Sequence, residues 1–503
     1  MKSTRHNPTQ PNTFLARWDG RPLAAMFFLL GVLTRLPFTS RLLYHWDSVN
    51  FALGMERFDV RLHQPHPPGY LLYVLMGRLL QAIFQDANTS LVVISLLFSG
   101  LTVAVVYLLA RQIFDRQSAL VAGLFTLTSP AVWFYGEVAL TYILESFFVT
   151  AIALACLQAL RGQRRMVYAA AILLGLAGGI RQTTLVLMLP LLAFVLLRWG
   201  WRERILGALA LGVTVLAWLA PTIALSGGLN DYLEASRSIG GGVLDDFELL
   251  NPNAGLVVRL SPLLRLGAYV GYGLMLAAIP LLYGTLALLS RWRSWRNWIR
   301  DARWQVMALW LLPNLIVYAP LVRAPGHTFS FITALLILAG GAWTQLVAGL
   351  AGRIGPRARA WTDAALGSVL LINVAFFLGA PGYLFGERRI ITTTPTRETI
   401  AYRDVYIGQR TAYIDEHFDP ARTLVLANGP DFRHPAYYLR AYTAVQTAAT
   451  IPAGVETLVL FSSELEHPAA ETAMLPNGET ISWLAVHPGA QVIVEDGRLT
   501  VLP

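Results

Sequence analysis

Chemistry-bearing side chains gather in one polar stretch, Arg41–Tyr73, which follows the first apolar run of the chain. It holds three acids and three histidines, namely Asp47, Glu56, Asp59, His45, His63 and His66. Tyr44 and Trp46 favour a membrane–water boundary, and Pro67-Pro68-Gly69 forces a turn. A connecting loop needs none of these groups, so we interpret residues 39–73 as a catalytic loop.

Asp47 is the central candidate. A carboxylate that is partly removed from water can act as a general base or hold a divalent cation, so Asp47 is the metal ligand if any ion is bound. The Asp47-Ser48 pair also suits a helix N-cap. His63 and His66 flank the turn and can bind phosphate. With His45 and Asp47 they form a conceivable zinc set, although the spacing matches no closed zinc motif.

Two further candidate groups adjoin later apolar runs. Glu137 lies at the end of one run, with Tyr142 and Glu145 just beyond, and acids beside membrane spans are costly and rarely face lipid. A structural carboxylate satisfied by helix ends would explain Glu137 equally well. Arg323 and His327 form a second cationic pair, for which a snorkelling arginine at the membrane rim is the alternative explanation.

Arg181 interrupts residues 167–197, where two short apolar runs meet at Gly178-Gly179. Such a pair leaves its turn recessed in the bilayer, where a central arginine costs about 3 kcal/mol. The cost is met if the guanidinium binds a phosphate or pairs with Glu137 or Glu145.

The composition identifies a polytopic membrane protein. The 503 residues are 55% hydrophobic and only 14% charged, with a mean hydropathy of +0.51. The net charge of +9 comes from arginines in short clusters between apolar runs, which is a topology pattern and excludes nucleic-acid binding. The single cysteine, Cys156, lies in an apolar run and excludes an internal disulfide.

Apolar runs occur near residues 22–38, 68–85, 91–110, 118–135, 138–160, 167–180, 182–197, 205–225, 263–290, 305–322, 328–350 and 362–380. The arginine clusters share the side of the basic segment 1–21 only if 68–85 does not cross the membrane. We therefore expect about eleven transmembrane helices and one interfacial or re-entrant helix. Segment 1–21 is then cytoplasmic, and the first loop and residues 381–503 are extracytoplasmic.

The last segment, 381–503, is less apolar and contains short strand-like runs at 423–426, 456–461, 491–494 and 499–502. A helix is expected at 396–418, and Asp496-Gly497 favours a hairpin turn. The fold class is therefore an α-helical polytopic membrane protein, residues 22–380, with a small C-terminal α/β domain outside the membrane.

Several of these motifs resemble the membrane-embedded GT-C glycosyltransferases, the group of protein O-mannosyltransferases and lipid A aminoarabinose transferases. Asp47-Ser48 is similar to their Asp-Glu pair, without the Glu, and His66-Pro67-Pro68-Gly69-Tyr70 to their Lys/His-Pro-Pro-Leu-Tyr. Gly178–Arg181 resembles a Gly-containing segment that ends in Thr-Lys. Tyr142 stands where many members carry Asp, so Glu137 would have to replace it, and Pro325–Phe331 matches a later motif loosely.

The resemblance implies an inverting glycosyltransferase of the bacterial plasma membrane that uses a polyprenyl-phosphate-linked hexose or pentose and a glycan, lipid or protein acceptor. Asp47 would orient or deprotonate the acceptor, directly or through a divalent ion, and Arg181, Arg323, His327 and His66 would hold the phosphate. A lipid or solute transporter or flippase is the alternative, but it should place polar groups deep in several spans. A catalytically inactive GT-C-like scaffold is a third possibility.

Overall fold

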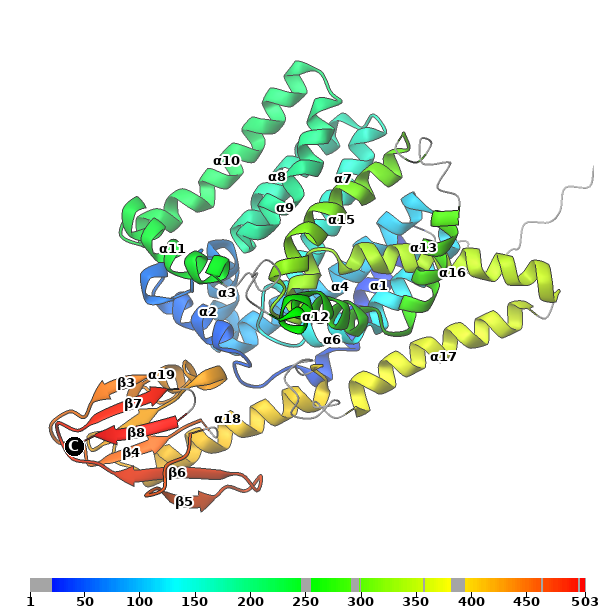
Figure 1. Cartoon of the computed structure of the whole chain (residues 1–503). Coiled ribbons are helices and arrows are strands. Elements are labelled where there is room, and N and C mark those ends of the chain that lie inside the picture. The colour runs from blue at the N-terminus through cyan, green and yellow to red at the C-terminus, as the bar shows by residue number, and fades with distance from the viewer. Residues whose placement is uncertain are drawn as a thin grey trace, which may run out of the picture.

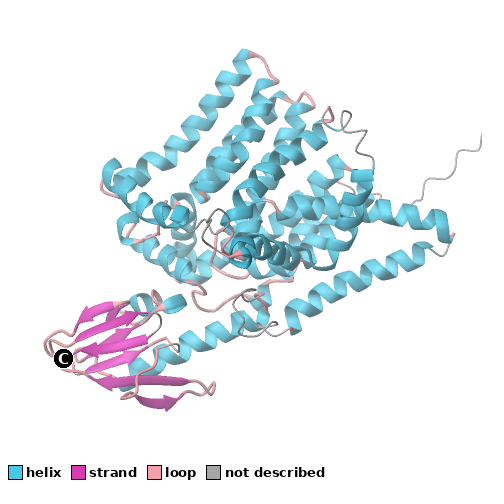
Figure 2. Cartoon of the chain, viewed as in Figure 1, coloured by secondary structure: helices cyan, strands magenta, loops and turns pink. Residues whose placement is uncertain are grey.

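The computed structural model describes residues 20–245, 255–290, 298, 300–355, 358–380, 394–462, 465–495 and 498–502. Helices form the first three quarters of the chain, and every strand among these residues lies in the C-terminal quarter (Figure 2). The two parts meet along one end of the helical bundle (Figure 1).

The helical part contains α1 Arg21–Leu33, α2 Trp46–Glu56, α3 Leu71–Phe84, α4 Ala87–Ile113, α5 Arg116–Thr128, α6 Pro130–Tyr135, α7 Tyr142–Leu160, α8 Arg164–Ile180, α9 Gln182–Leu197, α10 Trp201–Leu225, α11 Leu229–Asp245, α12 Leu256–Leu274, α13 Ala278–Ser290, α15 Ala302–Leu321, α16 Ile332–Ile354 and α17 Ala358–Gly379. Short 3₁₀ turns join several of them: η2 Leu36–Phe38, η3 Val60–Leu62, η5 Met275–Ala277 and η7 Pro325–Ser330.

Eight helical segments among the described residues are long and apolar enough to cross a membrane. They begin at Arg21, Ala87, Tyr142, Trp201, Leu256, Ala302, Ile332 and Ala360. The shorter helices α5, α8 and α9 coincide with the remaining predicted spans. The run at 68–85 forms α3, which is one of the shorter apolar helices, and its interfacial placement stays a prediction. The protein is therefore an integral membrane protein.

Helix α4 packs against α1, α3, α5 and α7 and forms the centre of the bundle. Close helix contact depends on small residues, because a Cβ added at Gly31 of α1 would come within 2.7 Å of the Gly100 Cα in α4. Almost three quarters of the most apolar window of α4 is buried inside the protein, against about a tenth in α10. α10 is thus the more lipid-facing helix.

Residues 226–262, between two of the apolar runs, contain α11. This helix is amphipathic and short of apolar residues, so hydropathy did not reveal it. Its Asp231 pairs with Arg61 at 2.8 Å, and its Tyr232 hydroxyl donates to the Pro68 carbonyl at 3.1 Å. α11 therefore covers the proline turn of the first loop.

The tail domain, Arg397–Leu502, contains α18 Arg397–His417, η8 Gly429–Asp431, α19 His434–Tyr438 and eight strands. The strands are β1 Thr423–Leu426, β2 Thr443–Val445, β3 Ala448–Thr450, β4 Thr457–Leu460, β5 Glu471–Met474, β6 Thr480–Ala485, β7 Gln491–Glu495 and β8 Arg498–Leu502. The expected helix and the four expected strands are confirmed. β7 and β8 pair antiparallel, with Glu495 opposite Arg498, while Asp496-Gly497 lies outside the described residues.

A mixed five-stranded sheet has the order β2-β1-β4-β6-β5, with β1 parallel to both β2 and β4. Side chains alternate between its faces. Leu424, Leu458 and Leu484 belong to the cluster shared with the small sheet β3-β7-β8, whereas Val425 and Val459 pack with α18. The tail domain thus has α18 on one face and a second sheet on the other.

Candidate active site

The first loop presents Asp47 from the first turn of α2. The N-cap of this helix is His45, whose Nδ1 accepts the Asp47 backbone N–H at 3.1 Å, and Ser48 completes the capping box. The N-cap reading of Asp47 was therefore wrong. The Asp47 carboxylate lies in the first turn of α2, at the positive end of the helix dipole.

Two histidines flank this carboxylate. His66 Nδ1 lies 3.3 Å from Asp47 Oδ1, and His45 Nδ1 lies 3.4 Å from Oδ2. Burial raises the pKa of Asp47, but His66, His45 and then Arg181 outweigh it and hold that pKa well below its usual range. Burial lowers the pKa of His66 more than Asp47 raises it. At neutral pH the site therefore combines an ionised Asp47 with a neutral His66.

A metal centre is not assembled around Asp47. Within the described parts of the chain, no three His, Cys, Asp or Glu side chains are grouped to hold a metal ion. His45 Nδ1 already accepts a backbone N–H, and the electrostatic neighbours of His63 include Arg433, a cation. These residues as placed do not fit a closed zinc site, and the steps proposed below use none.

Arg181 is the one residue between α8 and α9, as the recessed-turn prediction required. Its side chain is about nine-tenths buried, and its Nε lies 3.0 Å from Oε2 of the fully buried Glu145. Nη1 donates to the Thr141 hydroxyl at 3.1 Å, and Thr184 donates to Glu145 at 2.8 Å. Glu145 is thus the acid that compensates the arginine.

Tyr142 joins Arg181 to the later loop. The Arg181 guanidinium lies 4.3 Å from the centre of the Tyr142 ring, a cation–π contact. Gly326 in η7 also packs against the Tyr142 ring, because a Cβ added at this glycine would come within 2.5 Å of the ring. Glycine at 326 therefore lets the His327 loop approach the site.

The prediction that Arg323 and His327 form a cationic pair was wrong for His327. Burial lowers the pKa of His327 to about 3, with further lowering by Arg181 and Arg323. His327 Nδ1 also accepts the Arg323 backbone N–H at 3.3 Å. His327 is therefore a neutral donor through Nε2, and only the arginine carries charge.

Two predicted residues lie at the margin of this cluster. Glu137 is fully buried, with Arg35 as its main opposite charge, and neither of its carboxylate oxygens has a hydrogen-bond partner among the described residues. Its backbone carbonyl accepts the Ser40 N–H at 2.9 Å, which anchors the start of the first loop. His63, in a left-handed conformation after η3, is half-buried, and burial lowers its pKa.

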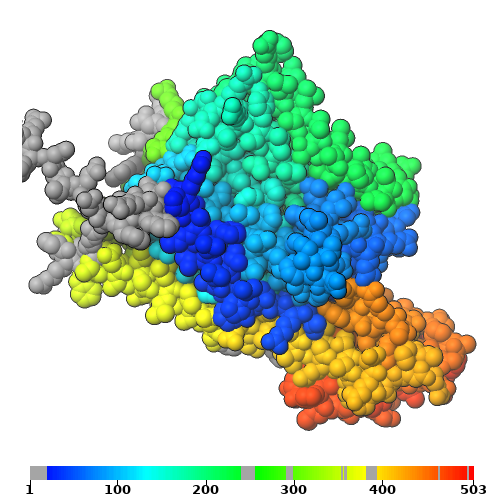
Figure 3. Space-filling view, turned by 180° about the vertical axis from the view of Figure 1, so that it is seen from behind, coloured from blue at the N-terminus to red at the C-terminus, as the bar shows by residue number. Residues whose placement is uncertain are grey.

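The tail domain contacts the first loop close to Asp47. Leu43 N–H donates to the Tyr438 hydroxyl at 2.8 Å, and its carbonyl lies 2.9 Å from His434 Nε2. The Trp46 and Phe432 rings are 5.7 Å apart. Figure 3 shows the blue surface of the N-terminal region against the orange surface of the tail domain. The contact lies four residues before Asp47.

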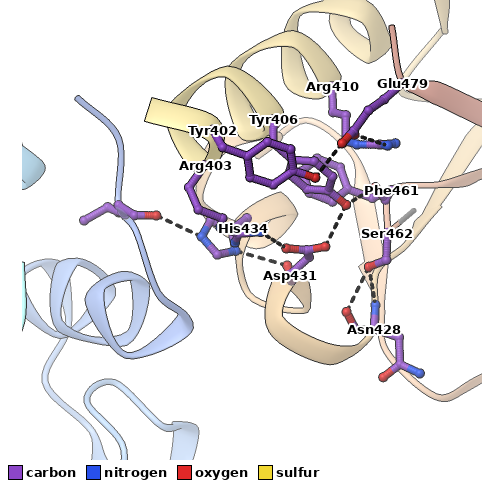
Figure 4. Close-up of polar contacts among 11 residues, drawn as sticks. Tyr402, Arg403, Tyr406, Arg410, Asn428, Asp431, His434, Phe461, Ser462 and Glu479 are labelled. Atoms are coloured by element: carbon purple, nitrogen blue, oxygen red, sulfur yellow. Dashed lines mark hydrogen bonds and ion pairs between the residues drawn. The ribbon is translucent and has the colours of Figure 1, made fainter. Parts of the chain in front are cut away.

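A buried network fixes His434 from behind. Arg403 and Tyr406 of α18 donate to the two Asp431 carboxylate oxygens at 2.7 and 2.8 Å (Figure 4). Burial, followed by Arg403, lowers the pKa of His434 to about 4, so the imidazole is neutral and donates through Nε2 to Leu43. The tail domain therefore presents a preorganised surface to the first loop.

Comparisons with known proteins agree with this architecture. Residues 65–224 match the family model of dolichyl-phosphate-mannose-protein mannosyltransferases. ArnT from Cupriavidus metallidurans, solved with undecaprenyl phosphate, is similar with a TM-score of 0.52 and 14% identity, covering 92% of this chain and 97% of that one. Archaeal oligosaccharyltransferase AglB from Archaeoglobus fulgidus, solved with an inhibitory peptide and a dolichol-phosphate, gives 0.53 and 12%, covering 93% and 74%. No curated protein sequence matches.

Proposed function

We propose that this chain, which has the GT-C fold, transfers a sugar from a polyprenyl-phosphate donor to an acceptor and inverts the anomeric carbon. The proposal is supported by the electrostatic influence of Arg181 on Asp47, which indicates that a carboxylate and a permanent cation serve the same site. Glycosyl transfer from a lipid phosphate needs both charges, one at the acceptor and one at the leaving group.

In this reaction the acceptor oxygen forms a bond to the anomeric carbon while the bond from that carbon to the phosphate oxygen breaks. Asp47 has a lowered pKa and is therefore a weak base. Its carboxylate orients the acceptor hydroxyl and accepts the hydroxyl proton once the new bond to the anomeric carbon makes that proton acidic. Arg181 Nη2, Arg323 and the His327 Nε2–H stabilise the departing polyprenyl phosphate. His66, His63 and Tyr142 shape the sugar subsite.

The donor sugar in this proposal is a hexose or pentose. The acceptor is a glycan, lipid or protein of the cell envelope. Release of polyprenyl phosphate from purified protein supplied with lipid-linked sugars and membrane extract is the direct test. Vesicles that instead move the lipid across the bilayer without cleaving it would support the transporter alternative.

The topology carries its own prediction. If α3 does not cross the membrane, the arginine clusters and the N-terminal segment lie on the same, cytoplasmic side. The first loop and the tail domain would then lie outside the bacterial plasma membrane. A reporter enzyme active only outside the cytoplasm, fused after Pro503, is expected to be active. The matched fusion after Arg165, in a predicted cytoplasmic cluster, should be silent; the reverse pattern would refute the assignment.

The tail-domain contact gives a second prediction. Tyr438→Phe removes the acceptor of the Leu43 N–H and is expected to lower turnover about fivefold, because one hydrogen bond contributes about 1 kcal/mol. Donor affinity should not change, since Arg181 is untouched. Tyr437→Phe is the matched control, because the neighbouring Tyr437 makes no hydrogen bond to Leu43, and equal effects of the two variants would contradict a positioning role.

A further inference from the structure

The tail domain contains a pocket of about 630 Å³ that is separate from the cluster around Asp47. It opens beside the five-stranded sheet, with Leu499 of β8 on its other wall. Its lining mixes hydroxyl groups, two arginines and several apolar side chains. Nothing in the proposed transfer reaction uses it.

The pocket lies over β4, β6 and β5 of the five-stranded sheet, at the carboxyl end of β4. Ser462, just after β4, lines the pocket and exchanges hydrogen bonds with the Asn428 backbone at 2.8 and 2.9 Å (Figure 4).

Hydroxyl groups form a row across the pocket floor. Ser482 of β6 is in register with Leu460 of β4 and with Thr472 of β5, and all three line the pocket. Thr480 lies two residues before Ser482, so its side chain is on the same side of β6, and it also lines the pocket. The hydroxyls of Thr472, Thr480 and Ser482 make no hydrogen bond to any described residue. They are therefore available to a polyhydroxylated ligand.

Two arginines make the pocket suitable for an acidic group. Arg410 is fully buried, stacks on Tyr406 and donates through Nη2 to Glu479 at 3.1 Å, while its Nε and Nη1 have no hydrogen-bond partner among the described residues. Arg498 is exposed at the rim, where no described carboxylate forms an ion pair with it. A buried guanidinium charge beside the pocket and an exposed guanidinium at its rim favour a ligand that carries a carboxylate or phosphate.

The remaining polar groups favour a sugar as the carrier of that acid. His467 Nδ1 accepts the Ala469 N–H at 3.2 Å, so its Nε2–H is left as a donor at the pocket wall. Glu466 offers an acceptor for sugar hydroxyls, and Leu465 and Pro468 offer apolar contact for ring C–H groups. We propose that this pocket of the tail domain binds an acidic saccharide of one or two rings, with its carboxylate or phosphate at Arg498.

The test uses the purified full-length protein in detergent and measures binding by saturation-transfer NMR and calorimetry, without any transfer assay. The probes are galacturonate, glucose 6-phosphate, glucose and inorganic phosphate. We expect one of the two acidic sugars to bind at least about tenfold more tightly than glucose, because a charge-assisted hydrogen bond is roughly twice as strong as a neutral one. Which of the two binds identifies the acidic group.

Paired variants tie binding to the pocket. Arg498→Gln and His467→Gln should each weaken the acidic sugar about tenfold, whereas Arg422→Gln and His487→Gln, at exposed positions of the same domain that do not line the pocket, should not. The proposal would be overturned if glucose or inorganic phosphate bound as tightly as the acidic sugars, or if neither acidic sugar bound. It would also be overturned if the control variants weakened binding as much as the pocket variants. Because no outcome depends on turnover, a failure here is distinct from a failure of the transfer function.

Discussion

Asp47→Asn is expected to lower the transfer rate at least about a hundredfold, the usual effect of removing one group that stabilises a transition state electrostatically. Asparagine keeps the shape and the hydrogen-bonding ability but loses the charge and the basicity. The N-cap of α2 belongs to His45, so the helix should persist. Expression, melting temperature and polyprenyl-phosphate binding should therefore stay close to those of the wild type.

Glu56→Gln is the matched control, because Glu56 lies in the same helix but pairs with the exposed Arg440, and exposed pairs contribute little. The measurement is release of polyprenyl phosphate from lipid-linked sugar. Substantial turnover by Asp47→Asn would move the catalytic role to Glu137 or another acid. A wild-type protein that binds the lipid but never turns over would instead support the inactive scaffold.

Arg181→Ala is expected to destabilise the fold and abolish donor binding together. It leaves the Glu145 carboxylate buried and uncompensated, and breaking a buried pair costs about 3–5 kcal/mol. The double variant with Glu145→Gln should recover much of the melting temperature but none of the donor affinity. Arg181→Lys should retain weak activity, since a point charge still attracts phosphate but lacks the planar donor geometry.

The measurement is the melting temperature in detergent with and without polyprenyl phosphate. The ligand should raise it for the wild type and not for the stable double variant Arg181→Ala/Glu145→Gln. An equal rise in both would remove Arg181 from the donor site and leave it as a purely structural partner of Glu145. Arg41→Ala, at an exposed position of the first loop, controls for a general loss of positive charge.

The sequence was most informative where hydrocarbon burial dictates composition. The boundaries of α4, α7, α10 and α15 follow long apolar runs, because every backbone group inside a bilayer must bond within its own helix. Arg181 was conspicuous for the same reason, because a charged side chain between apolar runs costs free energy in the bilayer. Its partner could be narrowed to two acids, and only three-dimensional packing decided for Glu145.

Elsewhere the local pattern was ambiguous. α11 has many polar residues, and the strands β2, β3, β5 and β6 are only three to six residues long, so neither hydropathy nor alternation distinguished them from loops. Asp47 and His45 are both plausible caps, and the side-chain geometry of His45 decided between them. His434 had no local feature to mark it, since its partner Leu43 is almost four hundred positions away in the sequence.

The capture of Leu43 has a consequence for how this architecture can be divided or recombined. A polypeptide ending at residue 380 would retain Asp47, Arg181 and every membrane helix, yet the peptide group of Leu43 would lose both of its tail-domain partners. Chimaeras that exchange the tail between relatives would have to exchange residues 41–44 with it. The tail domain and the loop segment 41–44 therefore form one functional unit, although helices α2 to α17 separate them in the sequence.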